Sequence, residues 1–313
     1  MHFRARYLIR DYDFQGAKIS ASDPKKRIYV QIAKRSDGET HPPLEPYQAV
    51  AVATCHRDIL ARVEEEAASS DSFSQYGEEV VQINHDLQEF VLRTIRLARW
   101  RTNCPKSGIS PIQYPLEFNW SLDGKEWKKY SDSGVKSIKI VFSTPFLPWT
   151  DEKAEFVRTE MLGELDEPLA HELLREAALN RKDNPRSSLV LAVAAAEIGF
   201  KQFAAASFPE AGWVLEKLQS PSLEAMLKVF PWSKLPARIN GKAPIVPSST
   251  KKGLKKAVEL RNQVVHVGVL KLDNGQVDSA LASVRDLLYF LDVLRGQGWA
   301  FVHMSQDALK SLS

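Results

Sequence analysis

The chain changes character near residue 150, where β-strand patterns give way to helical ones. Before that point, three runs either alternate apolar and polar residues or are rich in β-prone residues, as strands are. These runs are residues 26–34, 47–55 and 137–144. A chain that groups its strands first and its helices afterwards favours two separate domains. We therefore predict an α+β domain over residues 1–148 and an all-α antiparallel helical bundle over residues 149–313.

Two further features belong to the predicted N-terminal domain. Asp123-Gly124 separates two β-prone stretches and is typical of a two-residue hairpin turn. Residues 78–101 repeat apolar side chains near the 3.6-residue period, with glutamates at the start and arginines at the end, as an amphipathic helix does. We expect the strands to form a sheet that packs against this helix.

The predicted bundle follows a linker with two prolines at residues 144–153. Asn184-Pro185 and Ser220-Pro221 each combine a good N-cap residue with proline at the first helical position. Short connections between helices place successive helices antiparallel. Five helices are predicted, over residues 167–181, 184–207, 220–230, 248–268 and 276–296.

The motifs that the sequence lacks, its cysteine spacing and its charge argue against several functional classes. No P-loop, dinucleotide-binding or HExxH motif occurs, which argues against a nucleotide hydrolase or a zinc peptidase. Cys55 and Cys104 lack the spacing of a zinc site, so we expect reduced thiols and no metal or other cofactor. The net charge of +3 permits a polyanionic partner without demanding one. No apolar run reaches the roughly 20 residues that cross a bilayer, and the first residues lack a signal-peptide pattern. We therefore expect a cytoplasmic protein without membrane association.

Residues 260–268, LRNQVVHVG, place three polar side chains in an otherwise apolar run. On an ideal helix Arg261 falls in the middle of the apolar stripe, whereas Asn262 and His266 share the opposite side. That opposite side also carries four lysines: Lys251, Lys252, Lys255 and Lys256. Arg261 and His266 diverge by about 140° on such a helix. They can meet only if the helix distorts near Gly268 or if two copies of the helix come together.

Glu197 lies in a predicted helix that is apolar nearly all round, so its carboxylate needs a partner. Arg261, on the inward stripe of its own helix, and Lys201, at i+4, are both candidates. One interpretation is a buried ion pair between Glu197 and Arg261 that fixes helix register, with His266 capping a helix end. In a second interpretation the same pair orients Arg261 for chemistry.

The spacing Arg-Asn-x-x-x-His, from Arg261 to His266, resembles the R-x4-6-H motif of the HEPN superfamily (higher eukaryotes and prokaryotes nucleotide-binding). The polar residue after the arginine and the order of helices over roughly residues 165–297 are similar to that superfamily as well. The resemblance implies a HEPN-like bundle that dimerises and cleaves RNA without a metal. It also implies a toxin or anti-phage effector, with an antitoxin or a trigger-sensing protein as a further partner. The N-terminal domain would then sense the trigger or select the RNA.

The residue types suit such an endoribonuclease. His266 can move the protons of the reaction, and Arg261 can stabilise the crowded phosphate. Asn262 could position the phosphate or orient His266, and Glu197 supports Arg261. Lys251, Lys252, Lys255 and Lys256 could hold the RNA backbone by charge. The expected products are a 2′,3′-cyclic phosphate and a 5′-hydroxyl, and DNA should not be cut because it lacks the 2′-hydroxyl.

Other interpretations stay open. The bundle could be a non-catalytic interaction or nucleotide-binding module, with the activity in the N-terminal domain, or a purely structural dimerisation element. The lysines could simply form a solvated face. Trp120, Trp127 and Tyr130 are expected to pack the sheet, with base stacking as the alternative. Three histidines are expected to be surface residues rather than metal ligands: His85, His171 and His303.

Overall fold

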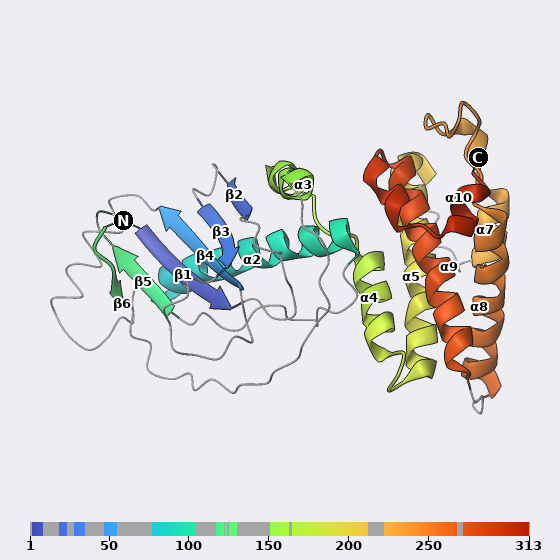
Figure 1. Ribbon diagram of the computed structural model, residues 1–313, viewed down its shortest axis with the longest axis horizontal. Helices are drawn as coiled ribbons and strands as arrows, with labels where there is room; N and C mark the ends of the chain where they lie inside the picture. The colour runs from blue at the N-terminus through green and yellow to red at the C-terminus, as the bar shows by residue number, and fades with distance from the viewer. Residues whose placement is uncertain are drawn as a thin grey trace. The chain divides into compact units, whose positions relative to one another are not determined.

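The computed structural model divides the chain into two compact units, Met1–Glu167 and Pro168–Ser313 (Figure 1). The described residues are 2–8, 19–23, 28–34, 47–54, 77–103, 117–121, 123, 125–129, 151–162, 165–211, 222–267 and 272–312. They are mostly helical, and the second unit is all-α, as predicted. The division falls after helix α3 (Asp151–Leu162), whereas the predicted boundary at 148/149 precedes that helix.

The first unit contains a six-stranded antiparallel sheet with the strand order β2-β3-β4-β1-β5-β6 (Figure 1). The strands are β1 (His2–Leu8), β2 (Ile19–Asp23), β3 (Ile28–Lys34), β4 (Tyr47–Thr54), β5 (Glu117–Ser121) and β6 (Lys128–Lys129). Ala5, Ile28, Val30 and Ala53 are buried, while Tyr29 between two of them is exposed. This alternation follows from the two-residue period of a strand, which sends successive side chains to opposite faces.

The structure confirms two of the predicted strands. The runs 26–34 and 47–55 correspond to β3 and β4, and the run 137–144 lies outside the described residues. The predicted hairpin between β5 and β6 is present. The prediction of a two-residue turn is wrong, because residues 122–127 connect the two strands. Within that connection Asp123 Oδ1 accepts hydrogen bonds from the backbone amides of Lys125 and Glu126. The Asp123 side chain therefore stabilises a connection that is longer than the expected two-residue turn.

Helix α2 (Gly77–Thr102) is the predicted amphipathic helix, and it packs against β1, β3 and β4. Leu87, Val91 and Ile95 are fully buried on it, at the expected helical spacing. Helix α3 packs on α2 and β2, which is why it belongs to the first unit.

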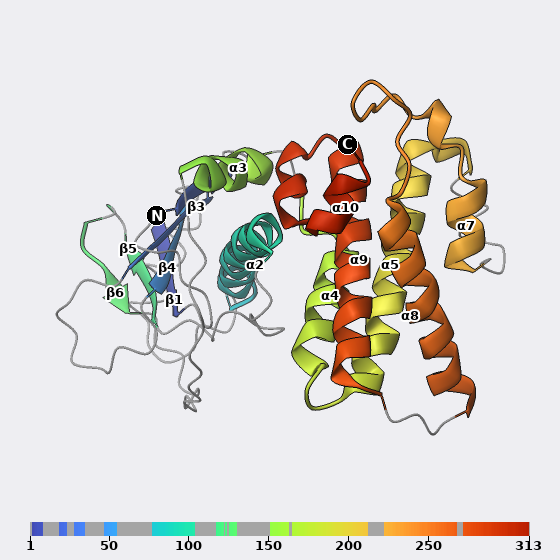
Figure 2. The ribbon, with the colours of Figure 1, turned by 45° about the vertical axis from the view of Figure 1, so that its right-hand side comes forward.

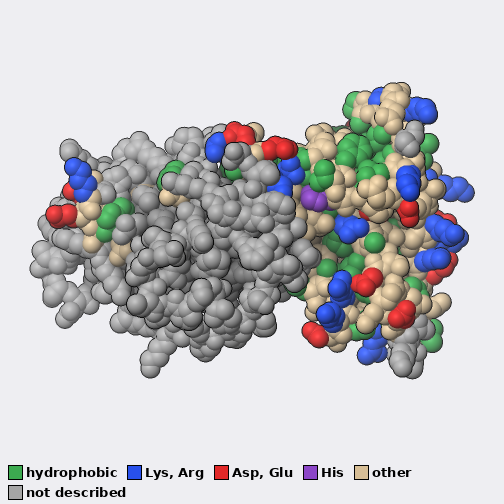
Figure 3. Space-filling model, viewed as in Figure 1, with side chains coloured by type: hydrophobic (Ala, Val, Ile, Leu, Met, Phe, Trp, Pro, Cys, Tyr) green, Lys and Arg blue, Asp and Glu red, His purple; other side chains and the backbone are tan. Residues whose placement is uncertain are grey.

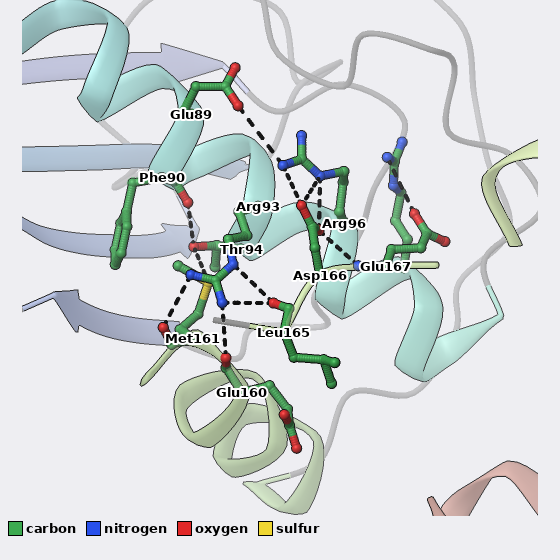
Figure 4. Close-up of polar contacts among 11 residues, drawn as sticks. Glu89, Phe90, Arg93, Thr94, Arg96, Glu160, Met161, Leu165, Asp166 and Glu167 are labelled. Atoms are coloured by element: carbon green, nitrogen blue, oxygen red, sulfur yellow. Dashed lines mark hydrogen bonds and ion pairs between the residues drawn. The ribbon is translucent and has the colours of Figure 1, made fainter. Parts of the chain in front are cut away.

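Two arginines of α2 hold the end of α3 and the segment after it (Figure 4). The last carbonyls of a helix have no partner within the helix. Arg93 meets this need, because its guanidinium donates to the carbonyl oxygens of Glu160, at 3.1 Å, and of Met161, at 3.2 Å. It also donates to the carbonyl oxygen of Leu165, just after the helix, at 2.7 Å. Arg96 forms a forked ion pair with Asp166, with a shortest distance of 2.6 Å. These contacts fix the chain up to the end of the first unit.

The second unit is a helical bundle whose long helices run side by side (Figures 1 and 2). Its α-helices are α4 (Leu169–Asn180), α5 (Pro185–Ser207), α7 (Leu223–Val229), α8 (Ser248–Val267), α9 (Asn274–Leu294) and α10 (Gln306–Lys310). Short 3-10 helices are η1 (Pro209–Ala211), η2 (Trp232–Lys234) and η3 (Gly298–His303). Helix α5 packs against α4, α8 and α9.

Helix α5 is long and apolar enough to cross a membrane, and half of its most apolar window is buried inside the protein. Its buried side chains form the core with α4, α8 and α9, which accounts for its apolar composition. Its start confirms the predicted cap, because the Asn184 side chain accepts a hydrogen bond from the Ser187 amide and Pro185 follows. Helix α7 starts later than predicted, with Ser222 rather than Ser220 as its N-cap.

Candidate functional site

Helix α8 presents two different faces. Leu254 and Ala257 are buried, and Ala257 forms a core cluster with Leu189 and Val193 of α5 and Ala280 of α9. This apolar stripe places α8 against both neighbouring helices, as its sequence period predicts.

Arg261 lies on the inward side of α8, where it pairs with Glu197 of α5. The guanidinium Nη2 is 2.8 Å from the Glu197 carboxylate oxygen Oε1. Of the two partners considered for Glu197, the structure therefore places Arg261 against it. The pair is only partly buried, because 25% of the Arg261 side chain and 29% of the Glu197 side chain remain exposed. A ligand can thus still reach the guanidinium from solvent.

Asn262 and His266 lie on the outer face of α8, and both are exposed. The helix runs without interruption to Val267, so the distortion considered for it is absent from its described residues. Within one chain Arg261 and His266 consequently point in different directions, as the ideal helix predicted. Val265 and Val267 beside His266 are exposed apolar residues.

The four lysines of α8 are all exposed, but they face two different hollows. Lys251, Lys252 and Lys255 line a groove of about 870 Å³ between α7 and α8, together with Asn262. Lys256 lines a separate hollow between α8 and α9. Lys and Arg side chains gather at the outer edge of the helical unit, over α7 and α8, with carboxylates among them (Figure 3).

The groove has an apolar floor and a charged rim. Leu223 and Leu227 of α7 and Leu254 of α8 are buried beneath it, and Trp232 of η2 also lines it. The Trp232 ring packs on a group of phenylalanines, and its indole nitrogen donates to the Leu227 carbonyl oxygen at 2.9 Å. These contacts hold the floor in place, so the groove is preformed.

The expectation of a surface position is wrong for one of the three histidines. His171 of α4 is buried, and its Nε2 lies 2.8 Å from Oδ2 of the buried Asp292 on α9. Its ring packs 4.8 Å from that of Tyr289, which also neighbours His303. His85 is exposed, as expected.

A signal for this buried pair was present in the sequence. Asp292 interrupts the apolar run LLYFLDVL, and such a carboxylate needs a partner for the same reason as Glu197 does. Applied here, that argument would have predicted a buried partner for Asp292.

Several other sequence predictions lie outside the described residues, among them those for Cys55, Cys104 and Tyr130. Within the part of the chain that the structure describes, no group of three or more His, Cys, Asp or Glu side chains is arranged to hold a metal ion.

The comparisons with protein-family models, with curated proteins and with solved structures find no match to this chain. The candidate site therefore depends on its own geometry.

Proposed function

We propose that the helical unit is a metal-independent endoribonuclease of the HEPN type. The observation that carries the proposal is the solvent access of both motif residues. Arg261 keeps a quarter of its side chain exposed beside Glu197, and His266 is exposed on the same helix. The exposed lysines beside Asn262 supply the positive charge that an RNA backbone requires.

The proposed reaction uses the 2′-hydroxyl of the RNA as the nucleophile. Its oxygen bonds to phosphorus as the bond from phosphorus to the 5′ oxygen breaks. His266 removes the 2′ proton or protonates the leaving oxygen, and Arg261 stabilises the charge on the phosphate oxygens. Asn262 positions the phosphate or orients His266, while Glu197 positions Arg261. The products are a 2′,3′-cyclic phosphate and a 5′-hydroxyl.

A second copy of the chain is part of the proposal. Because Arg261 and His266 diverge on α8, one chain does not bring them to one phosphate. A two-fold axis next to α8 would place Arg261 of one subunit near His266 of its partner. Exposed Val265 and Val267 next to His266 provide apolar surface for such a contact.

The wider role follows from analogy with the superfamily. We propose a cytoplasmic toxin or anti-phage effector whose first unit senses a trigger or selects the RNA, and which an antitoxin or trigger-sensing protein controls.

A second candidate function is a non-catalytic HEPN module that binds nucleotides or a partner protein. The ion pair between Arg261 and Glu197 favours the form that binds a partner protein, because a guanidinium already neutralised by a carboxylate has less charge to offer a phosphate.

An RNA-cleavage assay in EDTA separates the two candidates. We expect the parent chain to cut RNA. His266→Ala should lose cutting by at least about a hundredfold because it removes the proton-transfer group, and Arg261→Ala by a similar factor because it removes the charge that stabilises the phosphate. His85→Ala, which removes an exposed histidine from the first unit, is the matched control and should keep full activity. Cutting that persists in both site variants would refute the assignment. Cutting that is lost on adding EDTA would refute the metal-independent mechanism.

Mixing the two inactive variants tests the shared site. If each site takes Arg261 from one subunit and His266 from the other, a mixed dimer of Arg261→Ala and His266→Ala chains has one intact site. Activity should then return on mixing. With random exchange of equal amounts, about half of the dimers are mixed and each has one intact site of two, so the activity should reach roughly a quarter of the parent value. No recovery, with exchange shown by mass spectrometry, would contradict a site built from two chains.

A further inference from the structure

The groove between α7 and α8 has features that RNA binding does not use. Ile245 lines it and is 62% exposed, although large aliphatic side chains are usually buried. The leucines of the floor are already buried, so the apolar surface that a ligand can still cover comes from Ile245 and the half-buried Trp232. A phosphate backbone gains nothing from this apolar surface, whereas the apolar side chains of a protein partner would.

The rim of the groove is positively charged. Four lysines and two glutamates line it, which leaves a formal charge of +2: Lys228, Lys251, Lys252, Lys255, Glu224 and Glu259. One glutamate already forms an ion pair, because Oε1 of Glu224 lies 3.7 Å from Nζ of Lys255. Lys251 and Lys252 are exposed and have no ion pair within the described residues. The rim therefore complements carboxylates.

The length of the groove matches a helix. Its lining on α8 runs from Ser248 to Asn262, which spans about 21 Å, or about four helical turns. An amphipathic helix lying in a groove buries an apolar stripe at i, i+3, i+4 and i+7 and leaves its flanks beside the rim.

We propose that this groove is the docking site for an acidic amphipathic helix of a partner protein. The apolar stripe of that helix lies over Trp232, Ile245 and Val258, and its Asp or Glu flank lies beside Lys251 and Lys252. The inference does not require the ribonuclease activity. The groove shares its lysines and Asn262 with the proposed RNA site, so a docked helix would also keep RNA from these residues.

A synthetic probe tests this site on the full-length chain. The probe is a fluorescein-labelled helical peptide of about 16 residues, with leucines at the spacing above and glutamates on the flanks. Its anisotropy should rise on titration with the protein, and the affinity should fall as salt is added. A peptide with the same leucines but lysines in place of glutamates, and one with glutamines in place of leucines, should bind at least tenfold more weakly.

Substitutions in the groove test whether the peptide binds there. Ile245→Glu and Lys252→Glu should each weaken peptide binding at least tenfold. Val302→Glu is the matched control for an exposed aliphatic residue elsewhere on the unit, and Lys182→Glu is the control for an exposed lysine. Neither control should change the affinity. Ile245→Ala adds no charge beside the lysines, so it should also weaken peptide binding but leave RNA cleavage unaffected, and failure of the groove and failure of the proposed activity are then distinguishable.

Three outcomes would overturn the proposal. The first is equal binding of the acidic, basic and glutamine peptides. The second is that Ile245 substitutions weaken the binding of an oligouridine probe as strongly as they weaken the binding of the peptide. The groove would then be a nucleic-acid site. The third is a parent dimer, measured by sedimentation velocity, that Ile245→Glu converts to monomer, which would make a second copy of this chain the occupant.

Discussion

The ion pair between Arg261 and Glu197 can be tested by a double-mutant cycle. Arg261→Met removes the charge while keeping an apolar stem, and Glu197→Gln removes the charge with almost the same shape. The two groups are 2.8 Å apart and each keeps more than a fifth of its side chain exposed. The cycle isolates their coupling free energy from the other effects of the two substitutions.

The expected coupling lies between two limits. At an effective dielectric constant near 20, two charges about 4 Å apart attract by roughly 4 kcal/mol, but desolvation cancels part of this gain. Exposed pairs measure about 0–1 kcal/mol, whereas breaking a fully buried pair costs about 3–5 kcal/mol. For a pair that is about three-quarters buried we expect a coupling of about 1–2 kcal/mol, and a loss of similar size for each single variant.

Hydrogen exchange resolved by peptide is the suitable measurement, because it reports the stability of α5 and α8 separately from the first unit. The matched control is the exposed pair of Arg181 and Asp278, 3.3 Å apart and about half exposed. The cycle of Arg181→Met and Asp278→Asn should give less than about 0.5 kcal/mol. A coupling for Arg261 and Glu197 no larger than this control would show that the pair does not hold α8 against α5.

Three other substitutions test separate features of the protein. Asp286→Ala should destabilise α10 by about 2–3 kcal/mol in hydrogen exchange, because the buried carboxylate accepts both the amide and the hydroxyl of Ser305. Gly199→Ala should cost about 1–3 kcal/mol in thermal unfolding, because the new Cβ would lie 2.4 Å from Cδ2 of buried Leu288. Backbone amides lower the pKa of Asp123, so Asp123→Ala should destabilise the hairpin above pH 3.8. Amide exchange should show that difference shrinking as the pH falls through the lowered pKa.

Features that depend on local periodicity could be predicted from the sequence. The period of α8 put Arg261 on the inward stripe and Asn262 on the outer face, and both positions are correct. The Asn184 cap was also predictable, because the cap and its proline are adjacent in the chain. The pairing of Glu197 could be narrowed to two partners, because an apolar helix leaves few ways to satisfy a carboxylate.

Features that depend on distant contacts could not be predicted. The unit boundary follows α3 because Arg93 and Arg96 reach across about 70 residues to the end of that helix and to the segment after it, and no local pattern encodes these contacts. The choice of Arg261 rather than Lys201 as the partner of Glu197 likewise depends on how α8 packs against α5. The apolar floor of the groove was missed because its residues come from α7, η2 and α8, which are separate in the sequence.

The exposed surface of α8 is divided along its length, and this division relates the two proposals. Lys252 lies in the groove, and His266 lies beside the exposed valines about 21 Å further along the helix. A partner helix in the groove would cover the lysines without covering the end of α8 that the proposed dimer uses. Saturation with the acidic peptide should therefore lower RNA affinity while the mass in sedimentation stays that of the dimer. A fall to the monomer mass would mean that the groove and the self-contact overlap, and the two proposals could not then both hold.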